Sequence, residues 1–347
     1  MLIDGLHVPL TAPFYRDGRS YLRKLATNVG RYSLGPAAGL VALGPGSEGS
    51  GLSDEETRET LETIGQSAAA EKVLVAGIAK ESVRGALAVA EQAAKAGFDA
   101  VMLAAPRNWP ELMAAESMVF FSAVADASPL PVMLWSDGSA ASLQLPVDLV
   151  GELGGHSSVI GLYDADLSVE RFGAIAAATR HVRREVSVTA VFAPVTRRMK
   201  RAGDGDAGFV PVESLGSGAA VAVAAKPAVK TRVKAVGFQM MAAGGCAGLL
   251  PLLQAGVSGV LPRLAACAPQ ACYEVYAAFK DGDAGLSAEK AERVRGADAL
   301  MQELGVSGIK YGCDLNGYFG GLARLPRLSL TGAQRRRMEE VLREIRN

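Results

Sequence analysis

The feature that most constrains the fold is a short apolar run that recurs about every 30 residues along most of the chain. Each run ends in glycine, proline or a polar cluster, and helical patterns such as RGALAVAEQAAKA (84–96) lie between runs. This spacing is the length of one strand, one helix and two short loops. Near-continuous apolar strands that alternate with helices indicate a parallel sheet covered on its faces. The eight expected strands are 8–14, 39–44, 73–77, 100–105, 131–135, 159–163, 186–192 and 257–261.

Eight such units favour a closed (β/α)8 TIM barrel over an open doubly wound sheet. Helical patterns at 269–280, 287–304 and 331–346 follow the eighth strand and predict a C-terminal helical extension. We therefore expect one domain, with the barrel over residues 1–268 and its extension over 269–347.

The spacing of the runs breaks once, at about 194–236, where Gly, Ala, Val and basic residues dominate without a clear helical period. We interpret this stretch as an insertion after the seventh strand, on the face where the barrel strands end. Segments of this length are usually lids, interface arms or disordered. Its basic clusters lack interleaved aromatic residues, so we do not expect it to bind nucleic acid.

Charge and cysteine content exclude several classes of function. The chain has 36 basic and 36 acidic residues, so no global field attracts nucleic acid or a membrane surface. No stretch approaches 18 uncharged apolar residues, and the N-terminus lacks the pattern of a signal peptide. Four cysteines without a CxxC pair and three histidines argue against a metal site. We expect a cytoplasmic protein with buried thiols and no cofactor.

The glycine-rich stretch GPGSEGSG (44–51) follows the second expected strand. Its backbone N–H groups are free to converge on an anion, with the Ser47 hydroxyl as a further donor. It lacks the GK[ST] ending of a nucleotide loop and the spacing of a dinucleotide fingerprint. We therefore expect Pro45, Gly46 and Ser47 to bind a carboxylate.

Several motifs, in this order and at these spacings, resemble the dihydrodipicolinate synthase / N-acetylneuraminate lyase family over nearly the whole chain outside the insertion. The motifs are VPLTAPF (8–14) before Asp17-Gly18, the run 39–48, LSDEETR (52–58), AGFDA (96–100), AGVSGV (255–260) and RLP (324–326). The resemblance implies a (β/α)8 barrel with a helical extension, assembled as a dimer or tetramer. It also implies a lysine on the sixth strand that condenses with pyruvate or another 2-oxo acid.

The sequence departs from that family at the expected mouth of the barrel. The sixth strand ends Gly161-Leu162-Tyr163-Asp164, so Tyr163 stands where the family has its lysine, and a phenol cannot form an imine. Trp135-Ser136 replaces the tyrosine-asparagine that ends the family's fifth strand, and Pro45-Gly46 replaces its threonine pair. The arginine that synthases often carry beyond the fifth strand is absent from 137–141. Dihydrodipicolinate synthesis itself is therefore not expected.

Each candidate catalytic residue has two interpretations. Tyr163 with Asp164 is either an acid/base unit or a filler of the space vacated by the lysine beside a solvated or helix-capping carboxylate. Lys80, just past the third strand, is either an amine moved to a neighbouring strand or a surface partner of Glu81.

Candidate binding residues follow other strands. Arg107 is suited to clamp a carboxylate, with Trp109 as a wall, although this loop also fits a subunit contact. Arg263 is a similar candidate after the eighth strand. Trp135 and Ser136 complete the expected substrate site. Lys226, Lys230 and Lys234 of the insertion are alternative amines, and His7, His156 and His181 are expected to be structural or surface residues.

Two hypotheses remain from these residues. The first is a divergent lyase or aldolase that binds a small 2-oxo acid or sugar acid at the C-terminal mouth of the barrel. The second is a catalytically inactive barrel that serves as a ligand-binding or assembly subunit. A metal-dependent aldolase is a distant third.

Overall fold

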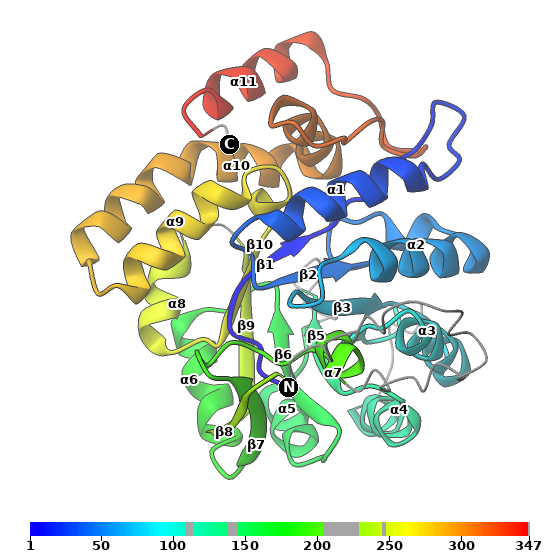
Figure 1. Cartoon of the computed structure of the whole chain (residues 1–347), viewed down its shortest axis with the longest axis vertical. Coiled ribbons are helices and arrows are strands. Elements are labelled where there is room, and N and C mark those ends of the chain that lie inside the picture. The colour runs from blue at the N-terminus through cyan, green and yellow to red at the C-terminus, as the bar shows by residue number, and fades with distance from the viewer. Residues whose placement is uncertain (108–113, 138–143, 204–228, 245–247, 346–347) are drawn as a thin grey trace, which may run out of the picture.

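Eight parallel strands close into a barrel in the order β1-β10-β9-β6-β5-β4-β3-β2 (Figure 1). The computed structural model describes residues 1–107, 114–137, 144–203, 229–244 and 248–345. The barrel strands are β1 (Gly5–Pro9), β2 (Gly39–Ala42), β3 (Val73–Ile78), β4 (Ala100–Ala104), β5 (Val132–Ser136), β6 (Val159–Asp164), β9 (Gln239–Gly244) and β10 (Gly259–Pro262). The expected TIM barrel is confirmed.

Helices surround the barrel because each carries one apolar face that packs on the outward side chains of the strands. They are α1 (Leu22–Leu34), α2 (Asp54–Ser67), α3 (Val83–Lys95), α4 (Ala114–Ala127), α5 (Val147–Gly154), α6 (Val169–Ala178) and α8 (Leu249–Ala255). Ser53 and Glu56 form a reciprocal capping box that fixes the start of α2. Ser82 caps α3 by accepting a hydrogen bond from the Gly85 N–H.

The interior of the barrel contains an imidazole among apolar side chains. His7 projects inward from β1, and its ring lies against Gly39 on β2 and Gly259 on β10. A Cβ at Gly39 would overlap this ring, so the glycine makes room for it. Complete burial lowers the pKa of His7 to about 4. His7 is therefore a neutral core residue at physiological pH.

The prediction that 186–192 is the seventh barrel strand was wrong. Residues Arg184–Thr189 form β7, which pairs with β8 (Thr231–Val236) in a separate two-stranded antiparallel sheet. Along β7, Val186 and Val188 are buried while Glu185 and Ser187 are exposed. Such alternation is typical of a strand with one solvated face, whereas the barrel strands are buried on both sides. The seventh barrel strand is β9, so the insertion precedes this strand and does not follow it.

The described part of the insertion also lies at the other end of the barrel from the one expected. Two residues of α7 (Arg197–Gly203) make contacts at that end. The Arg198 guanidinium donates to the Ala68 carbonyl before β3 at 3.0 Å, and the Arg197 backbone N–H donates to the Asp99 carboxylate before β4. Arg184 donates to the Gly154 carbonyl ahead of β6. These partners all precede barrel strands, and Figure 1 shows α7 and the β7–β8 hairpin beside the N-terminus. Residues 184–203 and 229–236 thus cover the N-terminal end of the barrel, opposite its mouth.

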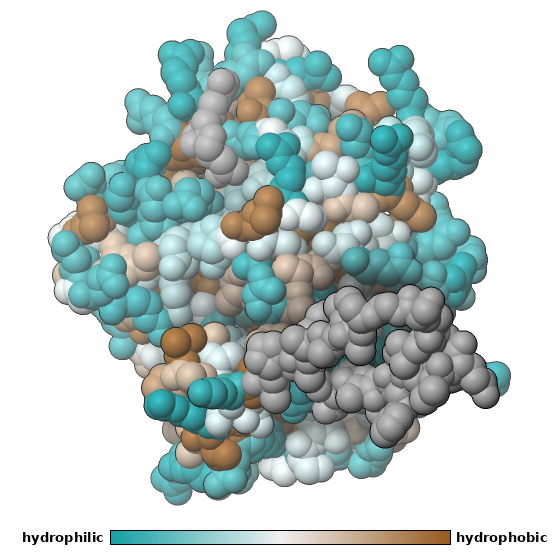
Figure 2. Space-filling model, in the orientation of Figure 1, coloured by the Kyte–Doolittle hydropathy of each residue, from teal (hydrophilic) through white to brown (hydrophobic). Residues whose placement is uncertain are grey.

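The C-terminal extension consists of α9 (Pro269–Lys280), α10 (Ala284–Leu315) and α11 (Gly332–Leu342). The helix expected over 287–304 extends further in the structure than predicted. Gly305 leaves helical geometry (φ 58°), but the chain resumes its helix and continues to Leu315. No helix in the described ranges is long and apolar enough to cross a membrane. On the face in Figure 2, small groups of apolar residues lie among hydrophilic ones.

Candidate functional site at the mouth of the barrel

Two aromatic side chains occupy the barrel interior near the carboxyl ends of its strands. Trp135 on β5 and Tyr163 on β6 are paired in register, and their ring centroids are 6.3 Å apart in an edge-to-face arrangement. Tyr163 is 2% exposed and packs among the side chains that fill the barrel interior. Burial raises the pKa of the Tyr163 phenol, and the nearby Arg263 guanidinium lowers that pKa by a smaller amount. The phenol therefore stays protonated at neutral pH.

Asp164 and Ser136, the next residues of the same two strands, face away from the barrel interior. The Asp164 carboxylate is 1% exposed and pairs with Arg171 of α6, Oδ2 to Nε at 2.7 Å. Arg171 also donates to the Leu145 carbonyl at 2.7 Å, and Ser136 Oγ accepts a hydrogen bond from the Leu145 N–H. These polar groups join α6 to β5 and β6. The structure does not bring Asp164 and Tyr163 together as an acid/base unit.

A small pocket at the mouth brings together two of the expected site residues, Lys80 and Arg107. It has a volume of about 210 Å³ and lies between the ends of β2 and β3, with Gly49, Ser50, Lys80 and Arg107 in its lining. Lys80 Nζ donates to Asp54 Oδ1 at 2.8 Å, so its partner is Asp54 and not the expected Glu81. Arg107 is ion-paired with Asp137 beyond β5. Two cations therefore border one pocket at the carboxyl end of the barrel.

The glycine-rich loop lies beside this pocket, but its first residues turn away from it. The Ser47 hydroxyl donates to the Gly44 carbonyl at 2.7 Å and accepts from the Gly49 N–H at 3.0 Å, so it is occupied within the loop. Gly46 (φ 77°) faces Ile309 of the C-terminal extension, and Pro45 is half-buried before it. Of this loop, Gly49 and Ser50 line the pocket in place of the expected Pro45, Gly46 and Ser47.

A buried ion pair joins the loop to the extension. Glu48 adopts a left-handed conformation (φ 62°), and its Oε2 lies 2.5 Å from Lys310 Nζ on α10. The side chains of Glu48 and Lys310 are 5% and 1% exposed. Burial lowers the pKa of Lys310, and the charge of Glu48 opposes that shift. Sequence patterns did not indicate Lys310, because it follows the predicted helix 287–304 and because lysines are rarely buried.

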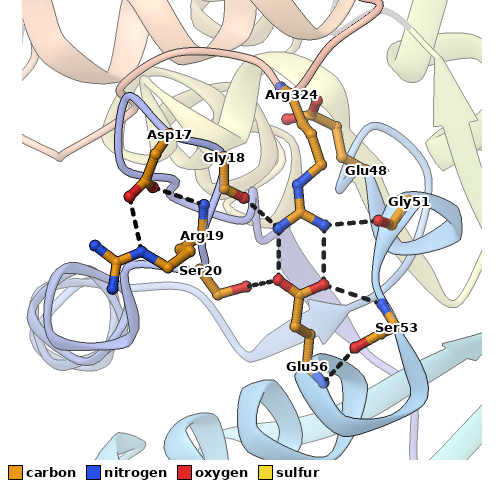
Figure 3. A network of polar contacts seen from close by, with 9 residues as sticks. All are labelled: Asp17, Gly18, Arg19, Ser20, Glu48, Gly51, Ser53, Glu56 and Arg324. Atoms are coloured by element: carbon orange, nitrogen blue, oxygen red, sulfur yellow. Dashed lines mark hydrogen bonds and ion pairs between the residues drawn. The ribbon is translucent and has the colours of Figure 1, made fainter.

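Arg324 makes a second connection between the extension and the mouth (Figure 3). Its guanidinium binds both carboxylate oxygens of Glu56, at 2.6 and 2.9 Å, and donates to the carbonyls of Gly18 and Gly51. The backbone N–H of Arg324 also donates to Glu48 Oε1 at 2.9 Å. The hydrogen bonds from Arg324 are the main reason that the pKa of Glu56 falls to about 2. The extension thus holds the glycine-rich loop at Glu48 and at Gly51.

The remaining candidates are dispersed. Arg263 is half-buried after β10 and close enough to lower the pKa of the Tyr163 phenol. Lys230 and Lys234 belong to the segment at the opposite end of the barrel. His156 pairs with Asp126, and His181 is exposed, both remote from the mouth. Trp109, Lys226 and Cys246 lie outside the described residues. Across the described ranges, no group of His, Cys, Asp and Glu side chains is arranged to hold a metal ion, and Cys267, Cys272 and Cys313 are buried.

Curated relatives of this chain include two aldolases. The chain is 29% identical over 169 residues to a probable mitochondrial 4-hydroxy-2-oxoglutarate aldolase from Emericella nidulans, which covers 46% of this chain and 54% of that protein. It is 21% identical over 331 residues to an L-threo-3-deoxy-hexylosonate aldolase from Aspergillus niger, and this match covers 93% of this chain and 88% of that protein. The chain spans little more than half the length of several curated relatives that it matches.

Solved structures show the same fold. A putative dihydrodipicolinate synthetase from Pseudomonas aeruginosa has a TM-score of 0.78 at 20% identity, covering 99% of this chain and all of that one. A prophage protein of the dihydrodipicolinic acid synthase family from E. coli K12, in complex with pyruvate, has a TM-score of 0.77 at 20% identity, covering 99% of each. The model of the dihydrodipicolinate synthetase family matches residues 2–187, more than half of the sequence. The chain therefore belongs to the dihydrodipicolinate synthetase family.

Proposed function

We propose that this protein binds a small 2-oxo acid or sugar acid in the pocket between the ends of β2 and β3. The observation that carries the proposal is that Lys80 and Arg107 line one pocket at the carboxyl end of the barrel. In TIM barrels, this end holds the ligand. An arginine is suited to a carboxylate because its guanidinium offers two parallel N–H donors.

Relatives support this class of ligand. One is named as an aldolase of 4-hydroxy-2-oxoglutarate, and a neighbouring structure contains pyruvate. Both molecules combine a carboxylate with an adjacent carbonyl. Arg107 would hold the carboxylate of such a ligand and direct its carbonyl towards Lys80.

Lys80 supplies the amine in the proposed reaction. After the ammonium loses a proton to water, its nitrogen attacks the 2-oxo carbon and forms a carbinolamine. Loss of water gives an iminium ion. In a 4-hydroxy-2-oxo acid, water then removes the proton of the hydroxyl on C4, the C3–C4 bond breaks to release an aldehyde, and the electron pair of that bond passes to the iminium to give an enamine. Protonation of the resulting enamine and hydrolysis of the imine then free the shortened 2-oxo acid. This lyase chemistry needs no cofactor.

Tyr163, Trp135 and Ser136 have supporting roles in this account. The raised pKa of Tyr163 removes it as a base at neutral pH, and its ring packs against Trp135 inside the barrel. Ser136 and Asp164 hold α6 through Arg171, and Arg263 supplies positive charge near Tyr163.

A catalytically inactive barrel is the second candidate. The resemblance to the family implies a lysine where Tyr163 stands, its ring packs against Trp135, and Lys80 is ion-paired with Asp54. In this case the pocket would bind the acid without forming an imine, and the chain would act as a binding or assembly subunit. The dimer or tetramer implied by the family remains a prediction, which light scattering of the purified protein measures.

Calorimetric titration of the purified chain with pyruvate and with 4-hydroxy-2-oxoglutarate tests binding. We expect at least one of these acids to bind, and Arg107→Ala to weaken that binding roughly tenfold through the loss of a charged hydrogen bond. Lys234→Ala is the matched control, because Lys234 lies at the opposite end of the barrel, and it should leave the affinity unchanged. Equal affinities for the Arg107→Ala and Lys234→Ala variants would exclude this pocket as the site.

A further inference from the structure

We propose that a second pocket, between the β1–α1 connection and the C-terminal extension, binds a small aromatic molecule that carries a negative charge. The pocket has a volume of about 530 Å³, which suits a molecule of one or two rings. Figure 1 shows the β1–α1 connection beside the segment that joins α10 to α11. Lys80 and Arg107 do not line it, so this inference does not rest on the function proposed for the mouth.

Aromatic side chains are concentrated in the walls of this pocket. The chain has only ten Phe, eight Tyr and two Trp, yet five aromatic residues meet here. They are Phe14, Tyr15, Tyr21, Tyr311 and Phe319. Tyr15 stacks on Tyr21 with ring centroids 3.9 Å apart, and Phe319 meets Tyr21 edge-to-face at 5.4 Å. Such faces and edges favour a planar ring over a flexible aliphatic chain.

The polar part of the lining gives the pocket a net positive charge. Arg16 comes from the β1–α1 connection and Arg335 from α11, where the Arg335 guanidinium lies 5.5 Å from the centre of the Tyr311 ring. Neither arginine forms an ion pair with a carboxylate in the described part of the chain. Asp314 is the acidic residue of the lining, and its Oδ1 accepts the Gly320 N–H at 2.8 Å and, more weakly, the Gly321 N–H. Two guanidinium groups therefore outnumber one carboxylate that is already hydrogen-bonded.

The two arginines define the head group of the ligand. A planar guanidinium binds carboxylate and phosphate oxygens in the same bidentate way, so both head groups fit. Arg16 and Arg335 come from segments more than 300 residues apart in the sequence. Their convergence on one aromatic pocket argues for a ligand with a charge at one end and a ring at the other.

Calorimetric titration of the full chain with 1-naphthoate and with 1-naphthyl phosphate tests the proposal, with neutral 1-naphthamide as the matched probe. At least one anion should bind, and the neutral amide should bind roughly tenfold more weakly because it loses the charged hydrogen bonds. Tighter binding of the carboxylate or of the phosphate would identify the head group. Failure of both anions to bind, or equal affinity for the amide, would overturn the proposal.

Variants locate the bound probe. Arg16→Ala and Arg335→Ala should each weaken binding of the anion roughly tenfold. Arg336→Ala is the control, because this neighbouring arginine is exposed and does not line the pocket. All three side chains lie at the surface, so circular dichroism should show the same folded chain in each variant. Equal weakening in the pocket variants and the control variant would place the anion elsewhere and overturn the assignment.

Discussion

Tyr163 and Asp164 are consecutive residues of β6 that project to opposite sides of the strand. The Tyr163 ring points into the barrel against Trp135, whereas the Asp164 carboxylate points away from the interior and binds Arg171 at 2.7 Å. Successive side chains of a strand alternate between its two faces. The two residues therefore have different structural roles: Tyr163 fills the barrel interior near its mouth, and Asp164 holds α6 through Arg171.

Removal of the Asp164 charge should destabilise the fold. Asp164→Asn leaves the nearly buried Arg171 guanidinium without its carboxylate, and breaking a buried ion pair in this way costs about 3–5 kcal/mol. Urea unfolding followed by circular dichroism measures the change. Asp17→Asn is the control, because its pair with Arg19 is exposed to solvent and should contribute little to stability. Similar losses for both variants would mean that the Asp164 pair does not hold α6.

His7 should make the stability depend on pH between about 6.5 and 4. Over this range the unfolded imidazole takes up a proton that the buried ring, with a pKa of about 4, does not. The free energy of unfolding should therefore fall as the pH falls, by up to roughly 3 kcal/mol, and this contribution should level off below pH 4.

Unfolding curves of His7→Leu and of the unmodified chain at several pH values isolate this contribution. His7→Leu should lose most of the slope between pH 6.5 and 4, and His156→Gln should retain it, because His156 lies outside the barrel beside Asp126. An unchanged slope in His7→Leu would mean that His7 is not the titrating group.

Lys310 and Glu48 should be strongly coupled in stability. Lys310→Met leaves the Glu48 carboxylate buried without its ammonium partner, at an expected loss of about 3–5 kcal/mol. Because an apolar pair avoids that unpaired charge, the double variant Lys310→Met with Glu48→Met should lose less than the sum of the two single variants. Urea unfolding of the four proteins gives the coupling energy. Simple additivity would contradict the geometry of the pair.

The barrel was predictable because short stretches of sequence specify its individual strands and helices. Continuous apolar runs such as 73–78, and the capping box at Ser53, indicate their elements without knowledge of the partners. The error at 186–192 arose because valines are frequent both in hairpin strands and in barrel strands. The polar residues Glu185 and Ser187, which alternate with the valines, were the sequence signal that this strand has a solvated face.

The site was less predictable because its contacts span the chain. Lys80 was expected beside Glu81 but reaches Asp54, 26 positions earlier, and Glu48 binds a lysine on α10. Nothing near Lys310 in the sequence distinguishes it from a surface lysine. The end of the barrel that the insertion covers was likewise set by distant partners, such as Asp99 and the Ala68 carbonyl.

Borohydride reduction in the presence of pyruvate tests the central claim most directly. If Lys80 forms an imine with a 2-oxo acid, reduction fixes the adduct, and mass spectrometry of the intact chain and its peptides should place it on Lys80. The Lys80→Ala variant should lose the adduct, whereas Lys234→Ala should keep it. No adduct with pyruvate or with longer 2-oxo acids, under conditions that label another family enzyme, would contradict lyase chemistry at Lys80. An adduct on another lysine would contradict it equally.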